Sequence, residues 1–187
     1  MSGGTRRSPR ANEPRPAIES LRVGKQEGVN TQLLSIYLND HLAGAIAGTE
    51  LARRALHNNR QTPLAVGLQR IVEEIEEDRR SLESLMDRVG ATRNPLKAVA
   101  AWTLEKAGRL KLNGSPFGYS PLSRVEELEA LSVGVESKRA LWSALRQVAG
   151  DGSDLELDLD DLIARAQSQR RRLERYRLEA VAQAFGT

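Results

Sequence analysis

Residues 76–83 read Glu-Glu-Asp-Arg-Arg-Ser-Leu-Glu, and residues 167–174 repeat the pattern as Gln-Ser-Gln-Arg-Arg-Arg-Leu-Glu. A second pair of similar pieces precedes these two. Residues 48–53 read Gly-Thr-Glu-Leu-Ala-Arg, and residues 134–139 read Gly-Val-Glu-Ser-Lys-Arg. Because the pieces occur in the same order in both halves, we interpret the chain as two copies of a helix pair.

Apolar residues recur at helical spacing in the first half of the chain, which predicts two long helices. The first begins near Thr31, with Asn30 or Thr31 as its N-cap. The second follows Pro63, a residue that suits a first helical turn, and Gly90 is its expected C-terminal stop. The first half therefore predicts a helical hairpin.

The second half has the same organisation. Ser123 and Glu126 have the spacing of a capping box at the start of the third helix, which we expect to stop at Gly150. The acidic stretch 151–161 leads into the fourth helix, because carboxylates near an N-terminus interact favourably with the helix dipole. A second hairpin is therefore expected.

The two expected hairpins are joined by a long connection, residues 94–122, in which residues 96–110 predict a short crossover helix. Such a connection allows the third helix to lie parallel to the second. The predicted fold class is an all-α four-helix bundle over residues 31–187. Residues 1–30 are rich in Pro, Gly and Arg and predict a disordered basic tail, apart from a short helical turn around residues 17–23.

Composition limits the classes of function. The 187 residues include 40% hydrophobic residues and no cysteine, which excludes disulfides, thiolate metal sites and a Cys nucleophile and suits a cytoplasmic protein. No apolar run is long enough to predict a membrane span. The net charge of +3 comes largely from tail arginines, and aromatic residues for base stacking are scarce, so nucleic acid is not favoured as a partner.

Charged residues interrupt the apolar faces of the second and fourth predicted helices. Asp78 and Arg79 break the apolar face of the second helix, and Arg170 breaks the fourth at the position that matches Arg79. The two histidines have ordinary explanations, His57 at a helix C-terminus and His41 at the edge of the core. No catalytic constellation is predicted, and the breaks are the candidate functional site.

Residues 45–53, Ala-Ile-Ala-Gly-Thr-Glu-Leu-Ala-Arg, resemble the rubrerythrin-type segment Ala-x-Ala-Gly-Glu-Ser-x-Ala-Arg of the ferritin-like superfamily. The resemblance implies a bundle in which helices 1 and 3 each provide a Glu, helices 2 and 4 each provide Glu-x-x-His, and the set binds two irons. In this chain the helix 1 Glu falls on Glu50, or on Thr49 if the Ala-Gly dipeptide sets the register. The helix 3 Glu falls on Glu136.

The two Glu-x-x-His motifs depart from the family pattern. The first becomes Glu76-x-x-Arg79 and the second becomes Gln167-x-x-Arg170. A guanidinium stays protonated and offers no lone pair to a metal. The departures therefore predict that the di-iron site is lost, and no cofactor is expected.

In place of the metals, the resemblance places a carboxylate–guanidinium network of Glu50, Glu76, Arg79, Glu136, Gln167 and Arg170 across the bundle centre. Loss of one partner from such a buried network would cost about 3–5 kcal/mol. The alternative is that the same residues are solvated surface charges.

The functional prediction is a structural or protein-interaction role, with a homodimer through a helical face implied by the resemblance. Two alternatives stay open at this point. One is a divergent ferritin-like oxidase or iron-binding protein that uses Glu50, Glu76, Glu136 and Gln167 with a nearby carboxylate such as Asp78. The other is a nucleic-acid accessory protein with a basic tail.

Overall fold

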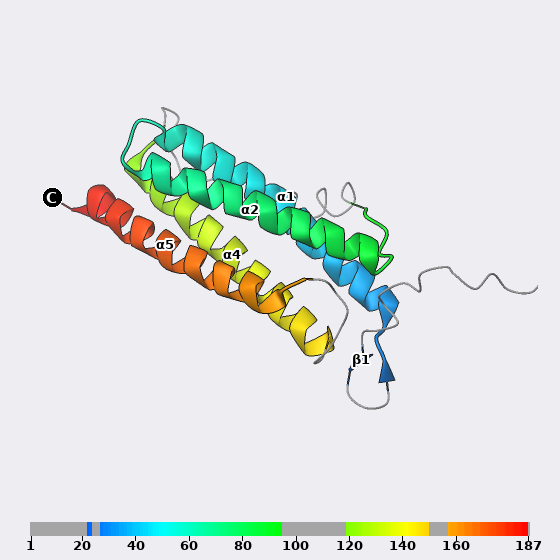
Figure 1. Cartoon of the computed structure of the whole chain (residues 1–187). Helices are drawn as coiled ribbons and strands as arrows, with labels where there is room; N and C mark the ends of the chain where they lie inside the picture. The colour runs from blue at the N-terminus through cyan, green and yellow to red at the C-terminus, as the bar shows by residue number, and fades with distance from the viewer. Residues whose placement is uncertain (1–21, 24–26, 95–118, 150–156, 187) are drawn as a thin grey trace, which may run out of the picture.

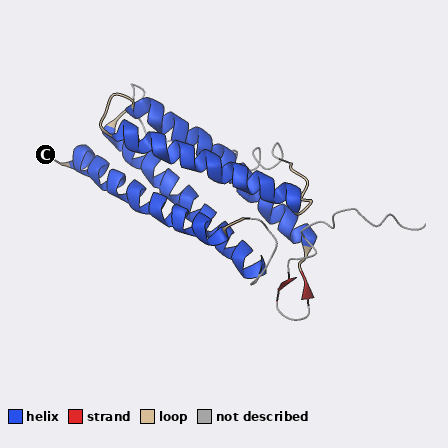
Figure 2. Ribbon diagram, in the orientation of Figure 1, coloured by secondary structure: helices blue, strands red, loops and turns tan. Residues whose placement is uncertain are grey.

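The computed structural model describes residues 22–23, 27–94, 119–149 and 157–186. A short antiparallel pair of strands comes first, β1 (Arg22–Val23) and β2 (Glu27–Gly28), with Arg22 opposite Gly28. Four long helices follow (Figures 1 and 2): α1 (Thr31–Asn59), α2 (Leu64–Arg88), α4 (Pro121–Ala149) and α5 (Leu159–Phe185). The predicted all-α four-helix bundle is confirmed.

Several expected features fall outside the described residues. They are most of the tail, the crossover helix 96–110 and most of the acidic stretch before α5. The helical turn expected around residues 17–23 is wrong in its last two residues, because these form β1.

Most helix boundaries follow the local sequence signals. The Oδ1 of Asn30 accepts a hydrogen bond from the backbone N–H of Leu33 at 3.0 Å, which confirms the predicted cap of α1. Gly90 has a φ of 67° and follows Val89, the C-cap of α2; this left-handed conformation favours glycine. Asp158 caps α5 in the same way as Asn30 caps α1.

The capping box predicted at Ser123 is wrong. Helix α4 begins two residues earlier, at Pro121, and the Oγ of Ser120 accepts a hydrogen bond from the N–H of Ser123 at 3.1 Å. A proline fits the first helical position because its missing N–H would have no intrahelical partner there.

The helices run up, down, down and up. The first apolar cluster joins the start of α1, the end of α2, the end of α4 and the start of α5. The second joins the four opposite ends. Helices α2 and α4 are therefore parallel, as predicted, and the connection between them has to return along a bundle roughly 40 Å long. Helix α1 packs beside α2 and α4, and α5 packs beside α4 and α2.

Candidate functional site: a buried ionic layer

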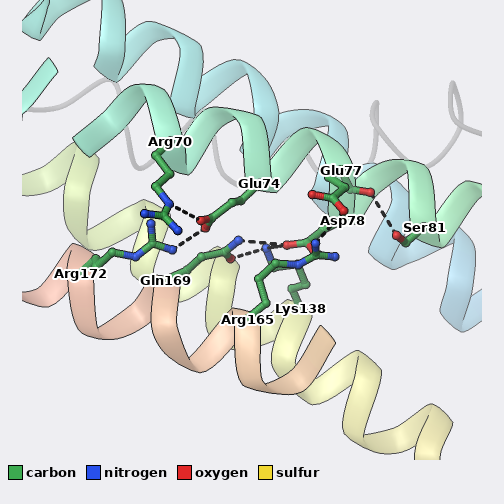
Figure 3. A network of polar contacts seen from close by, with 9 residues as sticks. All are labelled: Arg70, Glu74, Glu77, Asp78, Ser81, Lys138, Arg165, Gln169 and Arg172. Carbon is green, nitrogen blue, oxygen red and sulfur yellow. Dashed lines mark hydrogen bonds and ion pairs between the residues drawn. The ribbon is translucent and has the colours of Figure 1, made fainter. Parts of the chain in front are cut away.

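Asp78 is the centre of a polar network in the middle of the bundle (Figure 3). Its side chain is only 1% exposed. It forms an ion pair with Lys138 of α4, and its Oδ1 lies 2.8 Å from the Nη2 of Arg165 on α5. The Nε2 of Gln169 on α5 donates to its Oδ2 at 3.1 Å. One carboxylate of α2 is thus bound by side chains from two other helices.

Lys138 and Gln169 complete the inner part of the network. The Nζ of Lys138 donates to the Oε1 of Gln169 at 2.6 Å, so the Gln169 amide accepts from Lys138 and donates to Asp78. Burial lowers the pKa of Lys138, although the neighbouring Asp78 acts in the opposite direction. Asp78 is thus the neighbour that most favours the charged form of Lys138, whose side chain is only 15% exposed.

The outer part of the network continues along α2. The Nη1 of Arg165 lies 2.8 Å from the Oε1 of Glu77, and Arg172 of α5 forms an ion pair with Glu74. Arg70 adds a contact of 3.1 Å to Glu74 within α2. Burial acts to raise the pKa of Glu74, but the hydrogen bond and charge of Arg172 outweigh it, and this pKa is lowered.

We call this network the ionic layer; its members are Glu74, Glu77 and Asp78 of α2, Lys138 of α4, and Arg165, Gln169 and Arg172 of α5. All of its carboxylates come from α2, and its cross-helix cations all come from α4 and α5. The layer lies between the two apolar clusters along the bundle. The layer therefore separates two apolar parts of the core, with its negative charges on α2 and its cross-helix positive charges on α4 and α5.

The residues predicted from the resemblance lie around this layer. Glu50 is exposed, and Arg53 bridges it to Glu76 with contacts of 2.8 and 2.7 Å. Arg170 of α5 contacts Glu136 of α4 at 2.7 Å. These contacts bring Glu50 beside Glu76 and Glu136 beside Arg170, at the surface of the bundle.

The other two predicted residues do not join these pairs. Arg79 contacts Glu83, one turn further along α2, at 3.4 Å. Gln167 is exposed on α5. The six predicted residues are thus distributed over separate places, while a different set of side chains forms the buried salt bridges.

The buried residues are displaced by one position from the predicted ones. Asp78 and Gln169 are the third residues of the two repeated stretches, and Arg79 and Arg170 are the fourth. On α1 the buried residue is Thr49, the alternative register for the helix 1 position, and its hydroxyl donates to the carbonyl of Ala45 at 2.8 Å. The interruption at Asp78/Arg79 was the correct signal, and its first member is the buried one.

Lys138 and Arg165 were missed by sequence reasoning, although one signal was present. Lys138 occupies the position of the second copy that matches Ala52 in the first, and Ala52 is fully buried. A lysine at the position of a buried alanine points to an interior charge that needs a partner.

The ionic layer does not fit a di-iron centre. Such a centre needs carboxylate and imidazole ligands with free lone pairs, whereas Asp78 and Glu74 are bound by ammonium and guanidinium groups. No histidine belongs to the layer. Within the described ranges, no group of three or more His, Cys, Asp or Glu side chains is arranged to hold a metal ion.

Neither histidine of the chain contributes to the layer. Burial lowers the pKa of His41, against the effect of the neighbouring Asp40, and its ring packs edge-on against Tyr37 with centroids 4.5 Å apart. His57 contacts Arg60 at the end of α1. These environments agree with structural roles for both residues.

A second polar cluster lies at the end of the bundle where α1 ends and α4 begins. The buried Glu127 accepts hydrogen bonds from Arg54 at 3.0 Å, Asn58 at 3.2 Å and the hydroxyl of Tyr119 at 3.0 Å. Asn59 donates to the same hydroxyl at 2.7 Å. We call these five residues the end cluster. Burial raises the pKa of Tyr119 to about 12, with Asn59 acting against it and Glu127 in support.

Compared with protein-family models, with curated proteins and with solved structures, the chain matches none of them. None of the described helices is long and apolar enough to cross a membrane. The site has to be interpreted from its own geometry.

Proposed function

We propose that this protein is a ferritin-like bundle in which an ionic layer replaces the di-iron centre, and that its role is structural or interaction-based. One observation carries the proposal. Asp78 and Gln169, equivalent residues of the two repeated stretches, are hydrogen-bonded to each other in the buried middle of the bundle. Matching positions of the two sequence repeats thus meet in the buried polar centre of the bundle.

The topology supports this relationship. Ferritin-like bundles have a single long crossover, and their metal ligands project inward from facing helices in the bundle core. Here the long connection follows α2, and the charged side chains project inward at mid-height from α2, α4 and α5. This placement supports the proposal that the layer stands where ferritin-like bundles hold their metal ligands, with cations of the protein in place of metal ions.

We propose that the ionic layer specifies helix register. Desolvation of buried charges offsets much of their attraction, so a buried ion pair is weak evidence for added stability. A slip of α2 by one turn that moved Leu82 to the place of Asp78, however, would leave the ammonium of Lys138 without a carboxylate in the core. The layer therefore favours one alignment of the two hairpins over others.

In this proposal the six residues predicted from the sequence mark the outer edge of the former ligand layer. Glu50 and Glu136 each lie three residues before an arginine that binds them, Arg53 and Arg139. The same pairing in both copies supports a common origin of the two hairpins.

For partners we propose a second copy of the chain, bound through a helical face. Helix α1 exposes Leu33 and Ile36 on one turn near its start, and these are the apolar side chains that we expect at the contact. Light scattering on the purified chain and on the Leu33→Glu/Ile36→Glu variant measures the mass of each. A dimer that the variant converts to a monomer supports this face, and a monomeric parent chain contradicts it.

A nucleic-acid role for α5 receives less support. Of its three consecutive arginines, Arg170 binds Glu136 and Arg172 binds Glu74, so two are engaged within the chain. Arg171 is exposed, and it is the one arginine of this run with no ion pair among the described residues.

The proposal is tested by metal analysis after anaerobic incubation with ferrous iron and desalting. We expect no stoichiometric iron, because every buried carboxylate of the layer already has a cationic partner. About two irons per chain, as in di-iron bundles, would overturn the proposal. The Asp78→Asn variant is the control: iron that binds in the layer is lost with it, and iron at another surface is retained.

A further inference from the structure

The four neighbouring helix pairs are not packed equally closely. The two hairpins are tight, α1 packs directly on α4, and α2 and α5 approach each other least closely. The bundle therefore has one wide edge, the α2–α5 seam, opposite the close contact of α1 with α4.

Long polar side chains bridge this wide edge. Arg165 and Arg172 reach from α5 to Glu77 and Glu74 of α2, and Gln169 reaches to Asp78. Arg172 and Glu74 are both less than one-fifth exposed, so their ion pair lies within the seam rather than on its surface. The seam is closed in its middle by charge and hydrogen bonds.

The negative and positive charges of the seam come from different hairpins, so the ion pairs between them attract α2 to α4 and α5. Residues 73–78 of α2 include five carboxylates, Glu73, Glu74, Glu76, Glu77 and Asp78, which repel one another when the cations of α4 and α5 are removed. Arg70 of α2 still contacts Glu74, but among the described ion pairs Glu77 and Asp78 have their cations on α4 and α5 alone.

The opposite edge is held differently. Glu127 of α4 accepts hydrogen bonds from Arg54 and Asn58 of α1, so α1 and α4 are joined at one end by the end cluster. This connection contains no residue of α2 or α5. None of its hydrogen bonds involves a residue of the ionic layer.

We propose that the α2–α5 seam is the opening edge of the bundle, and that the two hairpins swing apart there about the α1–α4 contact. The ionic layer is the latch, and loss of its cross-seam ion pairs opens it while all four helices stay folded. The packing and the charges at this seam are independent of any relation to ferritin-like proteins.

Distance measurements between spin labels test this proposal. The chain has no cysteine, so paired substitutions to cysteine place labels uniquely. Ser84 of α2 and Gln167 of α5 are exposed and report on the seam. Gln32 with Ser84 reports on the first hairpin, and Ser137 with Gln167 reports on the second.

The opening variant is Glu74→Gln/Asp78→Asn at neutral pH. We expect the distance between Ser84 and Gln167 to become longer and its distribution broader, while both distances within the hairpins and the helical circular dichroism are retained. An unchanged distance across the seam would overturn the proposal. So would equal broadening of all three distances, because that indicates global unfolding rather than a hinge.

Two further variants keep the test decisive. Glu83→Gln is the matched control, because its carboxylate contacts Arg79 within α2 and lies outside the ionic layer. A seam that opens equally in this control contradicts the proposed latch. If the double variant fails to fold, Arg172→Gln leaves Asp78 and its partners intact and is expected to open the seam partially. No change in the seam of that folded variant would also overturn the proposal.

Discussion

The ionic layer and the end cluster each compensate a buried carboxylate, but with different partners. Each contains a carboxylate that is almost completely buried, Asp78 in the layer and Glu127 in the end cluster. Asp78 is compensated by two cations and an amide, with Lys138 and Arg165 themselves mostly buried. Glu127 accepts from one arginine, Arg54, whose side chain is more than half exposed, and from neutral groups.

The difference concerns what remains when the carboxylate charge is removed. In the ionic layer a buried ammonium is left without its counter-charge, which costs several kcal/mol. In the end cluster the donors left behind are neutral or reach solvent, so they find other partners. The centre of the bundle is therefore more sensitive to substitution than its end, although both carboxylates are buried.

Asp78→Asn provides the largest expected effect. The substitution preserves shape but removes the charge that stabilises Lys138, and we expect the free energy of unfolding to fall by about 3–5 kcal/mol. Urea denaturation measures it. The triple variant Asp78→Leu/Lys138→Met/Gln169→Leu removes the ion pair together with the amide between them, leaves Arg165 its contact with Glu77, and is expected to lose much less. A triple variant as unstable as the single one would contradict the role of unpaired charge.

Glu127→Gln is the matched substitution in the end cluster. We expect a loss of about 1.5–3 kcal/mol, the range for hydrogen bonds to a charged group, because the amide oxygen still accepts from Arg54 or Asn58. The same denaturation experiment compares it with Asp78→Asn. If Glu127→Gln were the more damaging of the two, the contrast between the centre and the end would be wrong.

Tyr119→Phe removes one neutral hydroxyl from the end cluster. It takes a donor from Glu127 and an acceptor from Asn59, and we expect a loss of about 1 kcal/mol. Thermal unfolding of the variant and the parent chain is the measurement. A loss as large as that of Asp78→Asn would show that the hydroxyl has a greater role than a single hydrogen bond.

Arg170→Ala provides the smallest expected effect and separates the predicted network from the observed one. Arg170 is 52% exposed and its partner Glu136 is partly solvated, so the loss should stay within about 0.5 kcal/mol. A loss of several kcal/mol in urea denaturation would instead indicate that Arg170 belongs to a buried network, as the resemblance to ferritin-like proteins implied.

Much of the fold was predictable because its signals are local. The apolar stripes, the cap at Asn30 and the stop at Gly90 depend only on neighbouring residues, and the structure has them where expected. The start of α4 was not predicted, because both Ser120 and Ser123 are acceptable caps and Pro121 decides between them. The direction of α4 relative to α2 followed from the length of the connection.

The sequence predicted a charged site in the middle of the bundle, but not which residues form it. Adjacent residues on a helix point about 100° apart, so the sequence located the polar interruption at Asp78/Arg79 without deciding which of the two faces inward. That choice depends on the rotation of α2 against α4 and α5, which is set by side chains distant in the sequence. The sequence alone thus determined four helices, two related hairpins and a charged break at mid-height. Only the tertiary structure decided that Asp78, Lys138 and Gln169 meet there, because the partners of Asp78 come from other helices and not from its own.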